Sequence, residues 1–428
     1  MNTFSKVMLL LFVLPLIIFS ADIHTPAFPG AEGFGAMVQG GRGGKLIFVD
    51  TLKDYHPETQ APVAGSFRAA CEAKGRRTIL FRVSGTIELE APILITEPFL
   101  TIAGQSAPGA GICIKNYGIA IKSYQVIVRH LRCRPGDVIG KKLAEQGQPW
   151  STDALSIGWG NASQVILDHC SASWASDEVM SVSGPDITDI TIQWCIISES
   201  LNNSTHEKGP HGYGSLLCSN GKISYHHNLI AFHRSRSPRP GVKGEGMPLI
   251  DIRNNLMYKG GRGYTVETEP VRMNFIGNYH PDTPFKATEN CHYYAENNVG
   301  EIHNGEPQNE PYPVATVTTT SPQEAREKIL KNAGATLPAR DEVDQRVVEW
   351  VIAGKGGIID SQQQVGGWPL LHSTPPPPDS DNDGMPDEWE IRHNFDVKTA
   401  NHNADPDYDG YTNIEEYLNQ TNPHEKDD

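Results

Sequence analysis

A run of basic residues without any carboxylate offers the first candidate chemistry. From Lys208 to Gly244 the chain contains no Asp or Glu, although the formal net charge of the whole chain is −15. The cations of this run are Lys208, Lys222, Arg234, Arg236, Arg239 and Lys243. A planar guanidinium donates paired hydrogen bonds and keeps its charge near neutral pH, so arginines are suited to hold carboxylates. We expect this run to bind a polyanion; a solvated basic loop is the alternative.

Two acidic segments near the C-terminus have the spacing of calcium-binding loops. The candidate ligands are Asp379, Asp381, Asp383, Met385, Asp387 and Glu390 in the first loop, and Asp405, Asp407, Asp409, Tyr411, Asn413 and Glu416 in the second. In an EF-hand loop carboxylates and one backbone carbonyl surround the ion, a glycine permits the sharp turn, and a final Glu binds through both oxygens. Gly384 and Gly410 stand at the turn, and Met385 and Tyr411 would supply the carbonyls. The sequence predicts a small α-helical EF-hand-like module that binds Ca²⁺; an acidic disordered tail is the alternative.

Four prolines separate these loops from the rest of the chain. Pro375 to Pro378 form a stiff spacer, and residues 375–428 hold fifteen Asp and Glu against three Lys and Arg. The acidity therefore belongs to the tail, and the rest of the chain is close to neutral. We assign residues 373–378 to a linker and residues 379–428 to the calcium module. The loops alone do not decide whether the module docks a partner or stabilises the terminus.

The first residues have the pattern of a secretory signal. In residues 1–21, Lys6 precedes an apolar run from Val7 to Phe19, and the small residues Ser20 and Ala21 follow. The run is too short for a comfortable membrane span. We expect a secreted protein, extracellular or periplasmic, with no membrane attachment in its mature form, no nucleic-acid partner and a monomeric state. The seven cysteines cannot all pair, and we expect most of them to be buried.

The elements that must position these residues are short strands that recur along the middle of the chain. Each has apolar residues at alternate positions and closes on Cys or Asn; they are VILDHC (165–170), ITIQWC (190–195), ISYHHN (223–228), IDIRNN (250–255) and MNFIGN (273–278). Earlier segments fit the same scheme: ILFRVSG (79–85), LTIAGQ (100–105) and VIVRHL (126–131). Steps of 25, 33, 27 and 23 residues between the closing positions are too long for hairpins and indicate stacked coils. We predict an all-β fold, a right-handed parallel β-helix over residues 22–315, because the blades of a β-propeller repeat at longer steps.

The closing residues and the sequence after the coils add detail to this fold. Asn228, Asn255 and Asn278 should stack as an amide ladder. Ser321 with Glu324 forms a capping box that opens one helix, and an apolar-periodic run from Asp341 to Ala353 predicts a second. We assign residues 316–372 to a helical segment that packs on the β-helix and carries no chemistry.

Several motifs in order along the chain resemble family 1 of the polysaccharide lyases, the pectate lyases. They are FPGAEGFGA (28–36), GGRGG (40–44), RTILFRVSGTIEL (77–89), LTIAGQSAPG (100–109), DALSIGWGNASQVILDHCSASW (153–174), HEK (206–208), YHHN (225–228) and RSPR (236–239). The resemblance implies a right-handed parallel β-helix and a calcium-dependent β-elimination of polygalacturonate. The tail resembles the dockerin-like or thrombospondin-repeat-like calcium modules of secreted bacterial carbohydrate enzymes.

The resemblance also implies roles for the basic residues. Arg236 matches the arginine that abstracts the C5 proton, although an arginine of ordinary pKa is a poor base. Lys208 matches a substrate-binding lysine and is the alternative base. Arg239 matches an arginine that holds a substrate carboxylate; Arg234, Lys243 and His206 are further substrate-binding candidates, since Gly241 stands where many relatives have a basic residue. As a surface arginine, Arg236 should contribute little to stability.

For the metal of the main domain, the resemblance implies acidic ligands on the same surface. Asp153 matches a calcium ligand of the family, and Asp177 falls where the family has another. Ser181 replaces a further aspartate, and an extra acid, Glu178, stands beside Asp177. We expect Asp153, Asp177 and Glu178 to hold Ca²⁺, with the substrate carboxylates completing the shell. Asp168, His226 and His227 are expected to brace the turns.

Four other functions remain open at this stage. A polygalacturonase would need paired carboxylates flanking the scissile bond, and the basic run contains none. A pectin lyase usually lacks calcium ligands, which speaks against a preference for methyl esters. A lyase for another uronate polymer, or a β-helix protein that binds polysaccharide without cleaving it, would also fit the export and the coils. Calcium dependence and an unsaturated product distinguish these functions from a pectate lyase.

Overall fold

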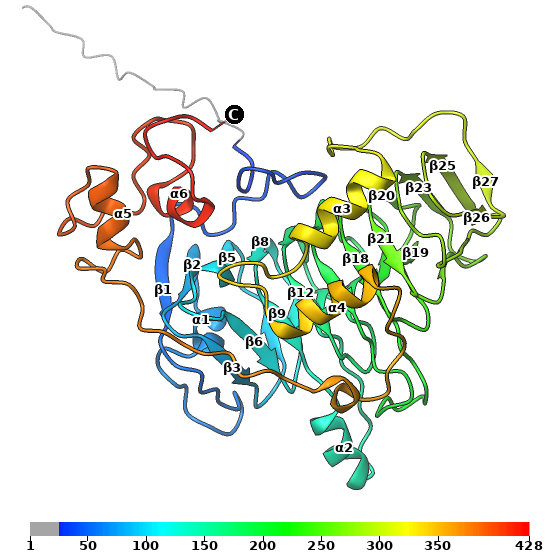
Figure 1. The fold of residues 1–428 in the computed structure, drawn as a ribbon, viewed down its shortest axis with the longest axis horizontal. Coiled ribbons are helices and arrows are strands. Elements are labelled where there is room, and N and C mark those ends of the chain that lie inside the picture. The colour runs from blue at the N-terminus through cyan, green and yellow to red at the C-terminus, as the bar shows by residue number, and fades with distance from the viewer. Residues whose placement is uncertain (1–24, 428) are drawn as a thin grey trace, which may run out of the picture.

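The computed structural model describes residues 25–427, and it is a parallel β-helix in which one long sheet runs the length of the molecule (Figure 1). This eleven-stranded sheet contains β1 (Lys45–Val49), β2 (Arg77–Phe81), β5 (Leu100–Ala103), β8 (Tyr124–Arg129), β11 (Ser163–Asp168), β14 (Ile190–Gln193), β17 (Lys222–His226), β20 (Leu249–Arg253), β23 (Val271–Ile276), β25 (Cys291–Glu296) and β27 (Glu306–Pro307). All eight strand segments predicted from the sequence lie in this sheet, in chain order, which confirms the predicted coils.

Two shorter parallel sheets complete the coils. The seven-stranded sheet contains β3 (Gly85–Glu88), β6 (Ile112–Lys115), β9 (Arg132–Arg134), β12 (Ser171–Ser173), β15 (Ile196–Ser198), β18 (Leu229–Ala231) and β21 (Leu256–Tyr258). The six-stranded sheet contains β4 (Ile93–Ile95), β7 (Ile119–Ile121), β10 (Leu155–Gly158), β13 (Met180–Ser183), β16 (Leu216–Ser219) and β19 (Arg239–Val242). A three-stranded sheet of β22 (Gly263–Tyr264), β24 (Phe285–Lys286) and β26 (Ile302–His303) follows in the last coils.

The turn that leaves the long sheet is tight and repeats from coil to coil. His130, His169, Trp194, His227 and Asn254 each have a φ near +50°, a conformation that bends the chain sharply into the next sheet. The asparagine that follows stacks as predicted: the amides of Asn228 and Asn255 donate to Asn255 Oδ1 (3.0 Å) and Asn278 Oδ1 (2.9 Å) on the next coils. The stacked asparagines therefore give hydrogen-bond partners to backbone N–H groups that are buried in these turns.

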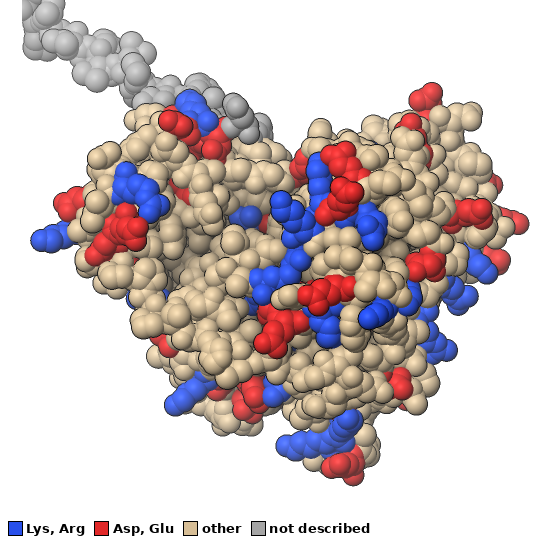
Figure 2. Space-filling view, viewed as in Figure 1, with Lys and Arg blue, Asp and Glu red and all other residues tan. Residues whose placement is uncertain are grey.

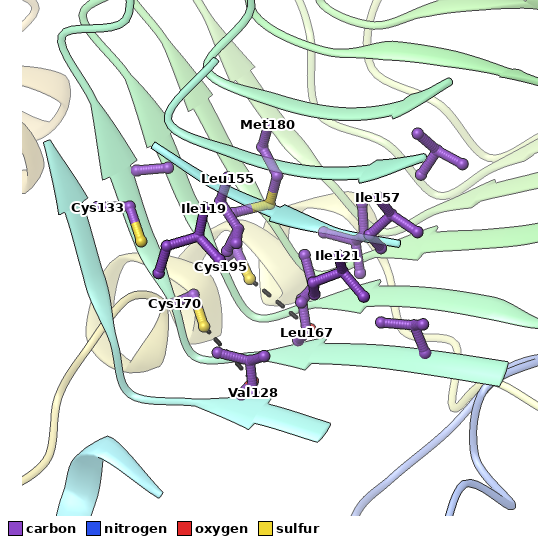
Figure 3. Close-up of a cluster of buried hydrophobic side chains, with 14 of the residues drawn as sticks. Ile119, Ile121, Val128, Cys133, Leu155, Ile157, Leu167, Cys170, Met180 and Cys195 are labelled. Atoms are coloured by element: carbon purple, nitrogen blue, oxygen red, sulfur yellow. Dashed lines mark hydrogen bonds between the residues drawn. The ribbon is translucent and has the colours of Figure 1, made fainter. Parts of the chain in front are cut away.

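The interior of the coil is a continuous apolar core. Ile119, Leu155 and Met180 stack on successive coils of the six-stranded sheet, and Cys133, Cys170 and Cys195 lie near them (Figure 3). All seven cysteines are free and buried, in agreement with the expectation that most of them lie in the core. Burial raises the pKa of the Cys113 thiol to about 11, so this thiol stays protonated and packs as a small apolar group.

Helices cover the outer face of the seven-stranded sheet. The predicted helices are α3 (Pro322–Asn332), with Ser321 as its N-cap, and α4 (Glu342–Ile352). Their apolar faces pack on Ile196, Leu229 and Leu256. Buried Arg134 of β9 contacts Asp341 and binds Asp344 Oδ1 at 2.7 Å, which fixes the start of α4. Two short helices, α1 (Phe67–Glu72) and α2 (Val138–Glu145), were not predicted; 3₁₀ turns span Gly104–Ser106 and Gln362–Val365.

The C-terminal tail packs on the outer face of the first strands of the long sheet. Each acidic loop leads into a helix, α5 (Asp387–Arg392) or α6 (Asn413–Asn419). Met385, Trp389, Ile414 and Leu418 bury their side chains against Leu80 and Ala103. Arg42 and Arg82 reach from the β-helix to Glu415 and Asp379, at 2.9 and 3.0 Å. The module is thus joined to the β-helix by an apolar contact flanked by ion pairs.

The signal expected in residues 1–21 lies outside the described residues. Within residues 25–427, no helix has the length and apolar character that a membrane crossing requires.

Candidate active site and calcium loops

The candidate catalytic residues of the main domain lie on the turns that lead into the six-stranded sheet. These turns are longer than those that leave the long sheet, and they stack on consecutive coils. Ala154 N donates to Glu178 O (3.3 Å), Glu178 pairs as an isolated bridge with Tyr213, and Tyr213 pairs in the same way with Ser235. Asp153, Glu178, Tyr213 and Arg236 therefore come from four successive turns and project from one edge of the coil.

Three carboxylates meet at this edge. One oxygen from each of Asp153, Asp177 and Glu178 lies within 4.8 Å of the others, and we call these residues the acidic cluster. Glu178 N donates to Asp153 Oδ1 at 3.2 Å, which orients that carboxylate. Burial and the neighbouring charge of Asp177 raise the pKa of Asp153 to about 8, against an opposing influence of Arg236. A bound cation would relieve the repulsion between carboxylates held this close. Carboxylate oxygens are also the hard ligands that calcium prefers.

Arg236 is not the exposed surface arginine that the sequence predicts. Its guanidinium contacts the Glu178 carboxylate, and the two side chains are 22% and 7% exposed. The same guanidinium lies 4.1 Å from the centroid of the Tyr213 ring. Its backbone φ of +59° is uncommon for a residue with a Cβ, so the coil holds Arg236 in a strained conformation. Arg236 is therefore a positioned residue, fixed by a carboxylate from one coil and a ring from another.

The other cations of the basic run do not form one patch. Arg239 binds Glu269 Oε1 (2.7 Å) and Cys218 Sγ (2.7 Å), and Arg234 donates to Pro210 O (2.8 Å). Lys222 belongs to β17 of the long sheet, where its Nζ lies 5.7 Å from the centroid of the Phe34 ring, away from the acidic cluster. Lys208 and Lys243 are exposed. The structure brings Arg236 to the acidic cluster, and it gives Arg239 a carboxylate partner of its own.

Two histidines complete the site, and only one of them was predicted. His206 Nε2 lies 3.4 Å from Asp177 Oδ2, and His211 Nε2 lies 3.8 Å from Asp177 Oδ1. Their rings stack with centroids 3.5 Å apart. His211, Tyr213 and Glu269 escaped the sequence analysis because each meets its partner across coils, where no short motif records the contact. The expected bracing residues are structural: buried Asp168 binds Arg129, His169 and Gln193, and His226 and His227 are buried.

The tail loops hold buried carboxylate oxygens that no protein group satisfies. Among the described residues, Asp381 Oδ2, Asp407 Oδ2, Asn413 Oδ1, Glu416 Oε1 and both oxygens of Glu390 are buried without a hydrogen-bond partner. Burial and the aspartates of the first loop raise the pKa of Glu390 to about 7; burial and the second-loop acids do the same for Glu416, against a hydrogen bond from Thr421. Buried unpaired carboxylates are costly, and oxygens from positions spaced as in an EF-hand fit a calcium ion.

A cavity of about 620 Å³ lies beside the tail module, apart from the acidic cluster. Gln105, Pro338, Trp389, Arg392 and Tyr417 are among its lining residues, so it separates the tail module from the connection between α3 and α4. Figure 2 shows this hollow beside a surface over α3 and α4 where charges of both signs are mixed. Asp153, Asp177 and Glu178 do not line this cavity, so we do not assign the candidate active site to it.

Known proteins show which family this arrangement belongs to. The chain is 34% identical over 431 residues to a probable pectate lyase C of Aspergillus flavus, and the match covers 93% of this chain and 94% of that protein. The chain belongs to the pectate lyase family. A probable pectate lyase C of Aspergillus oryzae is 33% identical with the same coverage. Pectate lyase 1 of Ambrosia artemisiifolia is 26% identical over 159 residues, 36% of this chain and 38% of that protein.

The chain is less similar in sequence to solved structures. The major allergen jun a 1 of cedar pollen matches with a TM-score of 0.49 at 18% identity, over 71% of this chain and 92% of that chain. A pectate lyase of Bacillus sp. N165 in complex with trigalacturonate matches with a TM-score of 0.49 at 14% identity, over 71% and 98%. No family model matches the chain.

Proposed function

We propose that this protein is a calcium-dependent pectate lyase that cleaves polygalacturonate by β-elimination. The observation that carries the proposal is the contact between Arg236 and Glu178 of the acidic cluster, made across two coils of a pectate lyase family member. The acidic cluster supplies hard oxygen donors, and Arg236 supplies a cation that the coil holds beside them. The elimination of a uronate requires a metal site and a nearby base.

The first requirement is to neutralise the uronate carboxylate next to C5. Calcium, when bound, supplies positive charge that makes the C5 proton more acidic and stabilises the enolate-like transition state. Asp153, Asp177 and Glu178 would hold it, because their oxygens already converge within 4.8 Å. Glu178 also contacts Arg236, so this carboxylate is shared between the two functions of the site.

The second requirement is a base. Only the neutral, deprotonated form of Arg236 can accept the C5 proton, which is why the assay is run at alkaline pH. The C5–H electron pair then forms the C4–C5 double bond, and the C4–O bond breaks to release the preceding part of the chain, whose oxygen gains a proton from water. Lys208 is the alternative base, and its exposure leaves it free to reach a polymer. Arg239, Arg234, Lys243 and His206 remain candidates for substrate binding. For Arg239 this role requires a substrate carboxylate to compete with Glu269.

We also infer that both tail loops bind Ca²⁺, which would satisfy the carboxylate oxygens buried there. The apolar side chains of α5 and α6 are already buried against the long sheet. This packing favours a module that stabilises the terminus of its own chain over one that docks a partner. Residues 1–21, with the pattern of a signal, support export of the protein.

The decisive experiment follows the ultraviolet absorbance of polygalacturonate with the purified protein at alkaline pH. Absorbance should rise in the presence of calcium and stop rising when excess chelator is added, because the product carries a conjugated double bond. Reducing ends without absorbance would instead identify a hydrolase. A rise only on methyl-esterified pectin, without dependence on calcium, would identify a pectin lyase. If neither signal appears on either polymer, the protein is not a pectate lyase.

A further inference from the structure

The acidic cluster borders a nitrogen donor that a site for calcium alone does not need. His211 Nε2 lies 3.8 Å from Asp177 Oδ1, and the His211 side chain is only 11% exposed. Calcium is bound by oxygen ligands, whereas imidazole nitrogen suits first-row transition ions. Among the described residues, one donor atom from each of Asp177, His206 and His211 lies within 4.8 Å of the others, and Asp177 also belongs to the acidic cluster. This carboxylate therefore joins an oxygen-rich group to a pair of imidazoles.

Backbone contacts determine which ring nitrogen of each histidine is free. The amide of Lys208 donates to His206 Nδ1 (3.0 Å), so a neutral His206 carries its proton on Nε2, which faces Asp177 Oδ2 at 3.4 Å. His211 differs, because its Nδ1 lies 3.2 Å from the carbonyl of Gly209, which can only accept. A neutral His211 therefore presents the bare lone pair of Nε2 to the Asp177 carboxylate.

This lone pair faces a negative charge across a gap that a direct hydrogen bond does not span. Hydrogen bonds from nitrogen to oxygen are about 2.7–3.2 Å long, and the distance here is 3.8 Å. Two electron-rich atoms that face each other at this separation are compatible with two ligands of one ion. Stacking holds the ring in this orientation: His206 lies 3.5 Å from it on one side and Tyr213 lies 4.5 Å from it, centroid to centroid.

We propose that His211 Nε2 and the acidic cluster bind a divalent first-row transition ion, with His206 orienting Asp177. His211 is a metal ligand in this proposal, and His206 is a positioning residue that leaves Asp177 Oδ1 directed at the ion. The site would still bind calcium through its carboxylates, and the imidazole would not contribute to calcium affinity. The inference rests on the proposed function in one respect only, that the acidic cluster is a metal site.

The test uses Mn²⁺ alone as the probe, with the full-length chain freed of other metals. The electron spin echo of bound Mn²⁺ reveals whether a nitrogen nucleus is coordinated. The tail loops offer carboxylate, amide and backbone oxygens at their ligand positions and no imidazole, so a nitrogen signal cannot come from them. We expect the nitrogen modulation in the wild-type protein and its loss in His211→Ala, with Mn²⁺ affinity at this site lowered by about 10-fold or more and calcium affinity unchanged.

Matched variants keep the result interpretable. His130, Asp168 and His169 form a separate group of possible ligands, so His169→Ala should retain the modulation. His211→Asn keeps a polar side chain, and circular dichroism checks that each variant is folded. Bound Mn²⁺ without nitrogen modulation in the wild type, or modulation that survives in His211→Ala, would overturn the proposal. The lyase assay is independent: a nitrogen signal without an unsaturated product would refute the proposed function and leave this metal site standing.

Discussion

The protein has two acidic centres, the acidic cluster and the tail loops, and they balance the negative charge of their carboxylates in different ways. In the main domain a protein cation lies inside the centre, where Arg236 contacts Glu178. In the tail both oxygens of Glu390 and one oxygen of Glu416 are buried and accept no hydrogen bond from any residue of 25–427. In our proposal an ion completes the tail loops, whereas in the main-domain cluster a metal ion and the substrate would have to displace a counter-charge that the protein already supplies. The comparison indicates a structural role for one centre and a catalytic role for the other.

The largest effect should follow from removing the internal cation of the main domain. We expect Arg236→Ala to lower kcat by about 10²–10⁴-fold, the usual contribution of a general base. It should also lower stability, because Glu178 is left buried without its partner, and breaking a buried pair costs about 3–5 kcal/mol. Rates of unsaturated product formation and thermal unfolding measure the two effects.

A double variant separates these effects. Arg236→Ala combined with Glu178→Gln removes the unpaired charge, so stability should return toward that of the wild type while activity stays low. Full activity in either variant would assign the proton transfer to another residue, with Lys208→Ala as the next variant to measure.

The next largest effect concerns the contact between the tail and the β-helix. Trp389→Ala removes a ring that packs with Leu80 and Ala103, and such a truncation costs about 3–5 kcal/mol. We expect proteases to cut the variant in the proline linker while the rate of lyase turnover per folded β-helix is retained. Ile391→Ala in the same helix is the matched control, because Ile391 is 66% exposed. Loss of turnover in Trp389→Ala alone would show that the tail takes part in catalysis.

Part of this comparison could be predicted from the sequence. Closing Cys and Asn residues recur once per coil, so the strands of the long sheet and the amide ladder were predictable. The strands of the other sheets escaped, because segments such as Ser171–Ser173 are short and their polar side chains are buried. The two acidic tail loops could be picked out because their candidate ligands are close together in sequence, and calcium binding by these loops stays a prediction.

The assembly of the main-domain site was harder to predict than its members. Asp153, Asp177, Glu178 and Arg236 were chosen by resemblance, yet no pattern indicated that Glu178 contacts Arg236 or that Glu269, 30 residues away in sequence, contacts Arg239. Such contacts depend on the length of each turn, because the turn lengths decide which side chains of different coils lie side by side. A single sequence does not specify this register outside the strands.

The smallest expected effect is the pH dependence of the metal-free tail. The folded-state pKa of Glu390 and Glu416 is raised to about 7, above the ordinary value of 4.5. Between these values the folded protein binds more protons than the unfolded chain, so stability falls as pH rises from about 4.5 to about 7. Thermal unfolding of chelated protein should show this decline, and calcium should remove it. A decline that is unchanged in Glu390→Gln with Glu416→Gln would place its origin elsewhere.

We infer that catalysis depends on a metal ion bound in the main domain and not on one bound by the tail. The most direct measurement is the calcium dependence of ultraviolet absorbance on polygalacturonate for two matched variants, Asp177→Asn and Glu416→Gln. We predict that Asp177→Asn loses the calcium-dependent rate, while Glu416→Gln retains it and loses only calcium-dependent thermal stability. The opposite result, an active Asp177→Asn and an inactive Glu416→Gln, would contradict the assignment of the two centres.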